Sequence, residues 1–283
     1  AMELACTRAR EAALGVKRAW ESLDTIFDAA DHRLAEIARL ADALDEPRTT
    51  HDEIAVLLRV LEGGRRDVIR DPLPLEAEIK KTLTPAIDAL ERRLQQRRAA
   101  RDQVRRELLR ASALREAMPL ARAEAVAAAR DMRRDFVPGG KSGDAPALVS
   151  DDAARALDAH WTDFEALVKA CRWELAAAGL TRFIETAERH IEQDRAVVLA
   201  FEAARARHGE LKSRLYTRRA QASELAARAI SEPRDRERQD EEARDVLALL
   251  DAQPAALDEI EARIDAYEQN VMALARRARG GGR

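Results

Sequence analysis

The sequence predicts an all-α protein made of elongated antiparallel helical bundles or coiled coils with several very long helices. Apolar residues recur at alternating steps of three and four, charged residues make up 36% of the chain, and aromatic residues only 4%. This combination is typical of long helices and coiled coils. No segment alternates with a period of two over a useful length, so no β-sheet is predicted.

Residues 3–44 carry the clearest pattern, a heptad seam sustained for more than five heptads. Its members are Cys6, Ala9, Ala13, Val16, Trp20, Leu23, Phe27, Ala30, Leu34, Ile37, Ala41 and Leu44. At 1.5 Å per residue, such a helix would be roughly 60 Å long. Pro47 is expected to end it.

A second helix is predicted from Thr50, with Thr50 as N-cap and Glu53 completing a capping box. Gly63-Gly64 is expected to interrupt this helix. A third helix is predicted over 75–135, in which Pro85 and Pro119 mark kinks or boundaries. Its apolar stripe comprises Ile79, Leu83, Ile87, Leu90, Leu94, Val104, Leu108, Ala111 and Met118.

Residues 136–150 form the longest non-periodic stretch and are predicted to be a flexible connector. They divide the chain into helical segments 1–135 and 151–283, with one continuous rod as the alternative. Ser150 is the expected N-cap of the next helix. Residues 151–231 are interpreted as one very long helix or two in series, with the phase disturbed at Gly179.

The last break is predicted at "SEPRD", with Ser231 as cap and Pro233 in the first helical turn. Beyond Pro254 the heptad steps are again strict. The residues of this final seam are Leu257, Ile260, Ile264, Tyr267, Val271 and Leu274.

Composition favours an intracellular, cytoplasmic protein. Cys6 and Cys171 are too few for a disulfide framework, and no apolar run approaches the ~18 residues of a membrane span. The opening Ala1-Met2 and the closing "GGGR" suggest a fragment of a larger protein. The net charge of −3 argues against a general affinity for nucleic acid.

An arginine-rich stretch at 91–110 is the main candidate binding surface for a polyanion or a partner protein. It holds Arg92, Arg93, Arg97, Arg98, Arg101, Arg105, Arg106 and Arg110. The favoured interpretation is the solvated face of a long helix, with acids pairing three or four residues away. Arg97 and Arg101 fall on the apolar seam, so they could instead face a neighbouring acidic helix. Trp173 is the candidate exposed anchor for a partner.

Other motifs predict no catalytic centre, cofactor or metal site. Gly140-Lys141-Ser142 matches the end of a phosphate-binding loop, but the first glycine of that motif and the preceding strand are missing. The histidines show no paired spacing, and Cys6 and Cys171 fit buried seam positions. The sequence therefore predicts a non-enzymatic protein without cofactors.

"LDAHWTDFEALVKAC" (157–171) resembles the first helix of a spectrin-type repeat, and "RAWESLDTIFDAADHRLAEI" (18–37) is similar. This resemblance implies three-helix bundles strung into rods, with Trp20 and Trp161 packed inside. The arginine- and alanine-rich composition of such a rod is similar to the central region of herpesvirus large tegument proteins. A coiled-coil protein of a GC-rich bacterium is the alternative.

These observations favour a structural rod that serves as a spacer and protein-interaction platform in a larger assembly, the virion tegument if that resemblance holds. Other proteins of the assembly are the expected partners, and a homodimer is open if an apolar stripe stays uncovered. One alternative is a helical module that binds nucleic acid or an anionic surface through residues 92–110. Another is a helical segment of a bacterial secreted effector or translocator.

Overall fold

The protein is all-α. A computed structural model describes residues 2–137, 146–227 and 232–280. The helices are α1 (Met2–Ala43), α2 (Arg48–Asp67), α3 (Pro72–Lys81), α4 (Leu83–Asp135), α5 (Asp151–Lys169), α6 (Trp173–Ala227), α7 (Pro233–Asp251) and α8 (Leu257–Gly280). The only β-type pairing in these ranges is an isolated bridge between Phe136 and Ala255. The predicted fold class is therefore confirmed.

The chain divides into two compact units, and the division differs from the one predicted at 136–150. Unit 1 comprises Ala1–Ala111 and Asp158–Phe183, and unit 2 comprises Ser112–Leu157 and Ile184–Arg283. Helices α4, α5 and α6 each contribute residues to both units. The 136–150 stretch lies wholly within unit 2, and its residues 138–145 are outside the described part of the chain.

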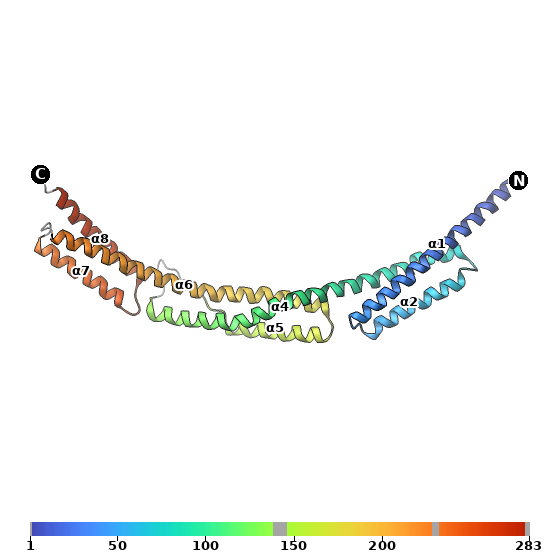
Figure 1. Ribbon diagram of the computed structural model, residues 1–283, viewed down its shortest axis with the longest axis horizontal. Coiled ribbons are helices and arrows are strands. Elements are labelled where there is room, and N and C mark those ends of the chain that lie inside the picture. The colour runs from blue at the N-terminus through green and yellow to red at the C-terminus, as the bar shows by residue number, and fades with distance from the viewer. Residues whose placement is uncertain (1, 138–145, 228–231, 281–283) are drawn as a thin grey trace. The chain divides into compact units, whose positions relative to one another are not determined.

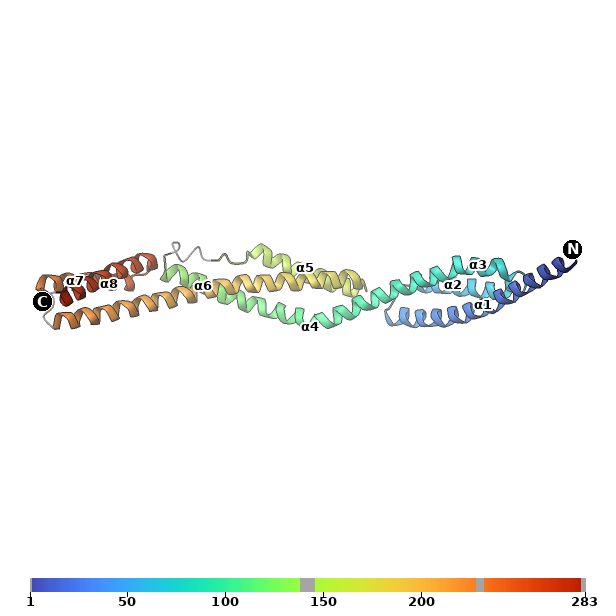
Figure 2. The same cartoon turned by 90° about the horizontal axis from the view of Figure 1, so that it is seen from above.

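In unit 1, α2 runs antiparallel to α1, while α3 and the first part of α4 run parallel to α1 (Figures 1 and 2). The core is built from the heptad positions of all four helices. Its main members are Leu23, Phe27, Leu34, Ile37, Leu44, Ile54, Leu61, Ile79, Leu83, Ile87, Leu90 and Leu94. Arg33 of α1 joins α4 at the edge of this core, with its Nη2 2.6 Å from Asp88 Oδ1. Hydrogen bonds to Glu91 and Asp88 raise the pKa of Arg33.

The predicted seam of α1 is buried only in its second half. The stripe is covered from Leu23 to Leu44, but Cys6, Ala9, Ala13, Val16 and Trp20 are exposed. Trp20 is 48% exposed, so the implied place of this ring inside a bundle is wrong. The buried role predicted for Cys6 is also wrong. The physical reason is that α2 and α3 flank α1 only along its second half (Figure 2).

The start of α2 also differs from the sequence prediction. The helix begins at Arg48, and Thr50 is a buried helical residue whose Oγ1 donates to Glu46 Oε2 at 3.1 Å. Thr50 is therefore not the N-cap. Gly63 and Gly64 lie inside α2 rather than interrupting it. A Cβ atom at Gly64 would lie 3.2 Å from the Phe27 ring, so glycine here permits close packing of α1 and α2.

Two helices, α5 and α6, lie in the described part, 151–227, of the predicted 151–231 segment. The break falls at 170–172, where Cys171 has a φ of 54°, and Gly179 is an interior residue of α6. Ser150 is confirmed as the N-cap of α5, since its Oγ accepts a hydrogen bond from the Ala153 amide at 3.1 Å. Trp161 is buried in unit 1 as predicted, with its ring 5.0 Å from that of Phe183.

In unit 2, α7 runs antiparallel to the second part of α6, and α8 runs parallel to it (Figure 1). The final seam is buried as predicted, and burial raises the pKa of Tyr267. The larger members of this core include Phe136, Leu211, Leu215, Val246, Leu250, Leu257, Ile260, Ile264, Tyr267 and Val271. Pro233 occupies the first turn of α7 as predicted, whereas Ser231 lies outside the described residues.

Candidate functional site

The arginine-rich stretch of α4 separates into an inward pair and an outward group. Arg97 and Arg101 are partly buried, whereas Arg92, Arg93, Arg98, Arg105, Arg106 and Arg110 are exposed. Helical geometry explains the separation, because positions four residues apart share one face of the helix. Arg97 and Arg101 lie on the face that carries Leu90, Leu94 and Val104 to the core.

Arg97 binds an acidic residue in the turn between α1 and α2. Its Nη1 donates to Glu46 Oε2, and the Glu46 side chain is only 1% exposed. Its Nη2 donates to the carbonyl oxygen of Cys171 at 3.2 Å, in the turn between α5 and α6. A single guanidinium thus links two turns of unit 1. A carboxylate buried this deeply requires a cation and hydrogen-bond donors, which Arg97 and Thr50 supply.

Arg101 completes this junction by donating from Nη1 to the carbonyl oxygen of Ala43, the last residue of α1. The last carbonyls of a helix have no partner within the helix, and a cation here also interacts favourably with the helix dipole. Asp45, two residues on, has a φ of 52°. The inward arginines therefore stabilise a helix end and a turn, which is a structural role.

The outward arginines form a basic surface that is interrupted by acids. Arg93 pairs with Glu53 of α2 at 2.5 Å, and Arg98 lies 3.9 Å from Asp102. Arg92 donates to the carbonyl of Asp88. Exposed pairs of this kind contribute about 0–1 kcal/mol each. The arrangement fits a solvated helix face.

Trp173 is not the exposed anchor that the sequence suggested. The residue is partly buried in the first turn of α6, and its Nε1 is buried without a hydrogen-bond partner among the described residues. Much of its ring is therefore unavailable to a partner. The exposed tryptophan is Trp20, which the heptad pattern had placed inside a bundle.

Unit 2 contains a second buried carboxylate, Asp194 of α6, which the sequence analysis did not single out. It accepts hydrogen bonds from Arg122 Nη1 at 3.2 Å and from the Val149 amide at 3.3 Å. The neighbouring Gln193 donates to the carbonyl of Ala147 at 2.8 Å. Asp194 and Gln193 thus hold Val149 and Ala147 to α6, so this end of the predicted connector is anchored.

His190 lies one turn before Asp194 on α6. Burial lowers the pKa of His190, although the Asp194 charge opposes that shift. The neutral imidazole is therefore favoured. His208 instead contacts the carbonyl of Leu250 at 2.9 Å and links α6 to α7.

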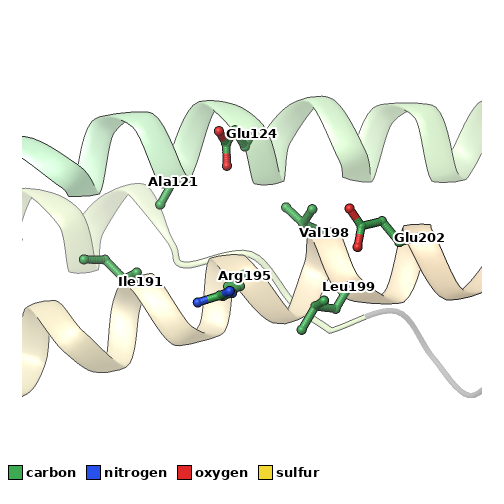
Figure 3. A pocket seen from close by; sticks show the side chains of 7 residues that line it. All are labelled: Ala121, Glu124, Ile191, Arg195, Val198, Leu199 and Glu202. Atoms are coloured by element: carbon green, nitrogen blue, oxygen red, sulfur yellow. The ribbon is translucent and has the colours of Figure 1, made fainter.

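Each unit contains a shallow hollow between helices. In unit 2 a groove of about 370 Å³ lies between α4 and α6, and Figure 3 shows the side chains of Glu124, Val198 and Glu202 around it. In unit 1 a groove of about 490 Å³ is lined by arginines and glutamates of α1 and α4, including Arg39, Glu36 and Arg98. Both grooves mix apolar residues with charges of both signs.

Candidate metal-ligand clusters and candidate membrane-spanning helices are absent from the described residues. Residues 2–137, 146–227 and 232–280 contain no group of three or more His, Cys, Asp or Glu side chains that could hold a metal ion. Within the same ranges, no helix combines the length and apolar character needed to cross a bilayer.

Comparison of the chain with protein-family models, with curated proteins and with solved structures finds no match.

Proposed function

We propose that this chain is a non-catalytic structural segment, a rod of helical bundles that acts as a spacer and protein-interaction platform in a larger assembly. One structural arrangement found in both units, a long helix shared by two groups of helices, supports the proposal. A long helix completes one group of helices and then continues as a member of the next group.

In unit 1 this helix is α4. Its Leu83–Leu94 part lies in the core formed with α1, α2 and α3. Further along, Arg97 and Gln103 contact residues at the start of the next helical group, Cys171 and Thr181. The same α4 helix therefore serves two sets of neighbours.

In unit 2 the corresponding helix is α6. Asp194 pairs with Arg122 of α4, whereas Arg207 pairs with Asp258 of α8 at 2.7 Å, three to four turns later. The resemblance to spectrin-type repeats implies bundles strung into rods, and helices shared between successive groups would connect such bundles. Long amphipathic helices leave a polar surface and a defined length, which suits a spacer.

Small-angle X-ray scattering of the monomeric chain tests this proposal. A compact domain of 283 residues has a radius of gyration of about 19 Å. A rod gives a value well above that and a cross-section typical of a three-helix bundle. A radius of gyration near the compact value would contradict the proposal.

A mobility-shift assay with duplex DNA separates the spacer from a nucleic-acid module. Binding through Arg92, Arg105 and Arg106 would weaken steeply with salt, because it depends on phosphate contacts. The spacer proposal expects no shift at low salt.

A further inference from the structure

The start of α1 extends beyond α2 and α3 of unit 1 (Figures 1 and 2). This part of the helix carries an exposed apolar stripe. We call residues 2–18 the α1 extension. All of them except Gly15 are exposed. The stripe consists of Met2, Cys6, Ala9, Ala13 and Val16, and it continues to Trp20 at the edge of the bundle.

This stripe is in phase with the buried seam of the same helix. Val16, Trp20 and Leu23 follow one another at steps of four and three, and Leu23 is fully buried while Val16 is 41% exposed. A heptad seam buries its apolar residues against a facing helix. The extension thus repeats the pattern of an established helix interface without a helix to cover it.

We propose that a second copy of this chain covers the stripe, with the two α1 extensions packed antiparallel about a two-fold axis. In the register that uses the whole extension, Met2 faces Trp20 of the second copy, Cys6 faces its Val16, and Ala9 faces its Ala13. A methionine thioether beside an indole ring is a favourable contact. The inference goes beyond the spacer role, because it assigns a self-association surface.

The side chains that flank the stripe fit this register. One flank carries Ala5 and Ala12, and small residues allow two helix axes to approach closely. The other flank carries Glu3, Arg10 and Lys17, each one residue after a stripe position. Antiparallel pairing places Glu3 of each copy near Lys17 of the other, which gives two attractive pairs against one Arg10–Arg10 contact at the axis.

Other arrangements fit less well. A shift of one heptad towards the bundle would place Arg10 near Lys17 twice, and it would require Leu23, which is already buried in the core. A parallel pair would set the alanine flank against the charged flank, so it would form no acid–base pairs. The proposed antiparallel register is therefore the one that covers the exposed Val16 and Trp20 and also pairs Glu3 with Lys17.

Cysteine cross-linking tests the register, since Cys6 is native and exposed. In a Cys171→Ser background, we expect Val16→Cys to give a disulfide-linked dimer joined to Cys6 of the other copy on mild oxidation. Peptide mapping identifies the bond. The matched control is Leu14→Cys, which lies on the same helix, is also exposed, and points away from the stripe. It is expected to give little cross-linked dimer.

Sedimentation velocity over a range of concentrations tests the association itself. The unsubstituted chain should shift from monomer to dimer as concentration rises, with a Kd on the order of micromolar or weaker for so short an interface. Val16→Glu should abolish the shift while Leu14→Glu retains it, with unchanged helix content in both. A chain that stays monomeric at every concentration overturns the proposal. So does a Cys6–Cys6 disulfide in the Cys171→Ser chain, which indicates parallel packing.

Discussion

Glu46 and Arg97 show how a single buried pair organises unit 1. The Glu46 carboxylate is removed from solvent in the α1–α2 turn, and its charge is balanced by a guanidinium 51 residues away in the chain. Desolvating both groups is costly, so the pair adds less to stability than its Coulomb energy suggests. Removing only one partner is strongly destabilising, because the other charge then stays buried without its counter-charge.

We therefore expect Arg97→Ala to destabilise the protein by about 3–5 kcal/mol, as is typical when one partner of a buried ion pair is lost. The matched control is Arg106→Ala, an exposed arginine on the same helix, which should change the free energy of unfolding by less than about 0.5 kcal/mol. Urea unfolding followed by circular dichroism measures both. Equal effects of the two substitutions would contradict the structural role of Arg97.

The adjacent glycines of α2 make a second residue-level comparison. Gly63 has no atom within 4 Å of a built Cβ, whereas at Gly64 the Cβ would lie 3.2 Å from Phe27 and 3.3 Å from Ile79. Gly63→Ala should stabilise the protein by about 0.5–1 kcal/mol through helix propensity. Gly64→Ala should be less favourable than Gly63→Ala by about 1–3 kcal/mol, the usual effect of overpacking a core. Thermal or urea unfolding that ranks the two substitutions the other way would refute the close α1–α2 approach.

The role of an individual residue could be predicted only where it follows from the position of that residue on its own helix. Arg97 and Arg101 were recognised as polar residues on an apolar face, which requires an acceptor nearby. Their partners, Glu46 and the Ala43 carbonyl, could not be inferred, because they come from a turn brought close only by packing. A search for isolated acids beside predicted helix ends could have found Glu46.

At the scale of the element, helix ends were predicted best where a side chain caps its own helix. Ser150 caps α5 through the amide of Ala153, three residues later. Thr50 offered a similar pattern, yet α2 begins two residues earlier at Arg48 and turns the Thr50 hydroxyl to Glu46. The Thr50 hydroxyl thus bonds the buried Glu46, four residues earlier in the chain, instead of supplying a cap worth about 1 kcal/mol.

Ser150→Ala should accordingly destabilise the protein by about 1 kcal/mol, because the first turn of α5 loses its side-chain acceptor. Ser223→Ala is the control, since this exposed serine lies near the end of α6 and donates to the Arg219 carbonyl within the helix. It should leave stability unchanged or raise it by a few tenths of a kcal/mol. Chemical denaturation distinguishes the two, and a Ser150→Ala protein as stable as its parent would count against the cap.

The position of the helix break within residues 151–231 also differs from the sequence prediction. Gly179 looked like the interruption, but its Cβ position is open and α6 passes through it without a break. The chain turns at Cys171 instead, which takes a positive φ although it is not glycine. No local signal marks this site, and the contact of its carbonyl with Arg97 holds the turn from outside.

For the whole molecule, the division into units could not be predicted from the position of the longest loop. Segment 136–150 is the most irregular part of the sequence, yet its described residues 147 and 149 bond to α6 within unit 2. Compact units are defined by which helices share a core. A heptad stripe specifies that a helix needs neighbours without specifying which ones.

The sequence by itself determined the helical class, some helix boundaries such as the starts of α5 and α7, and the buried seam of α8, because these follow from the period of apolar residues and from local capping. Tertiary structure decided which stripes are covered. It left residues 2–18 of α1 largely exposed, turned Trp173 inward and paired Arg97 with Glu46. The reason is that periodicity records the face a helix buries, whereas the partner that buries it depends on contacts between residues far apart in the chain.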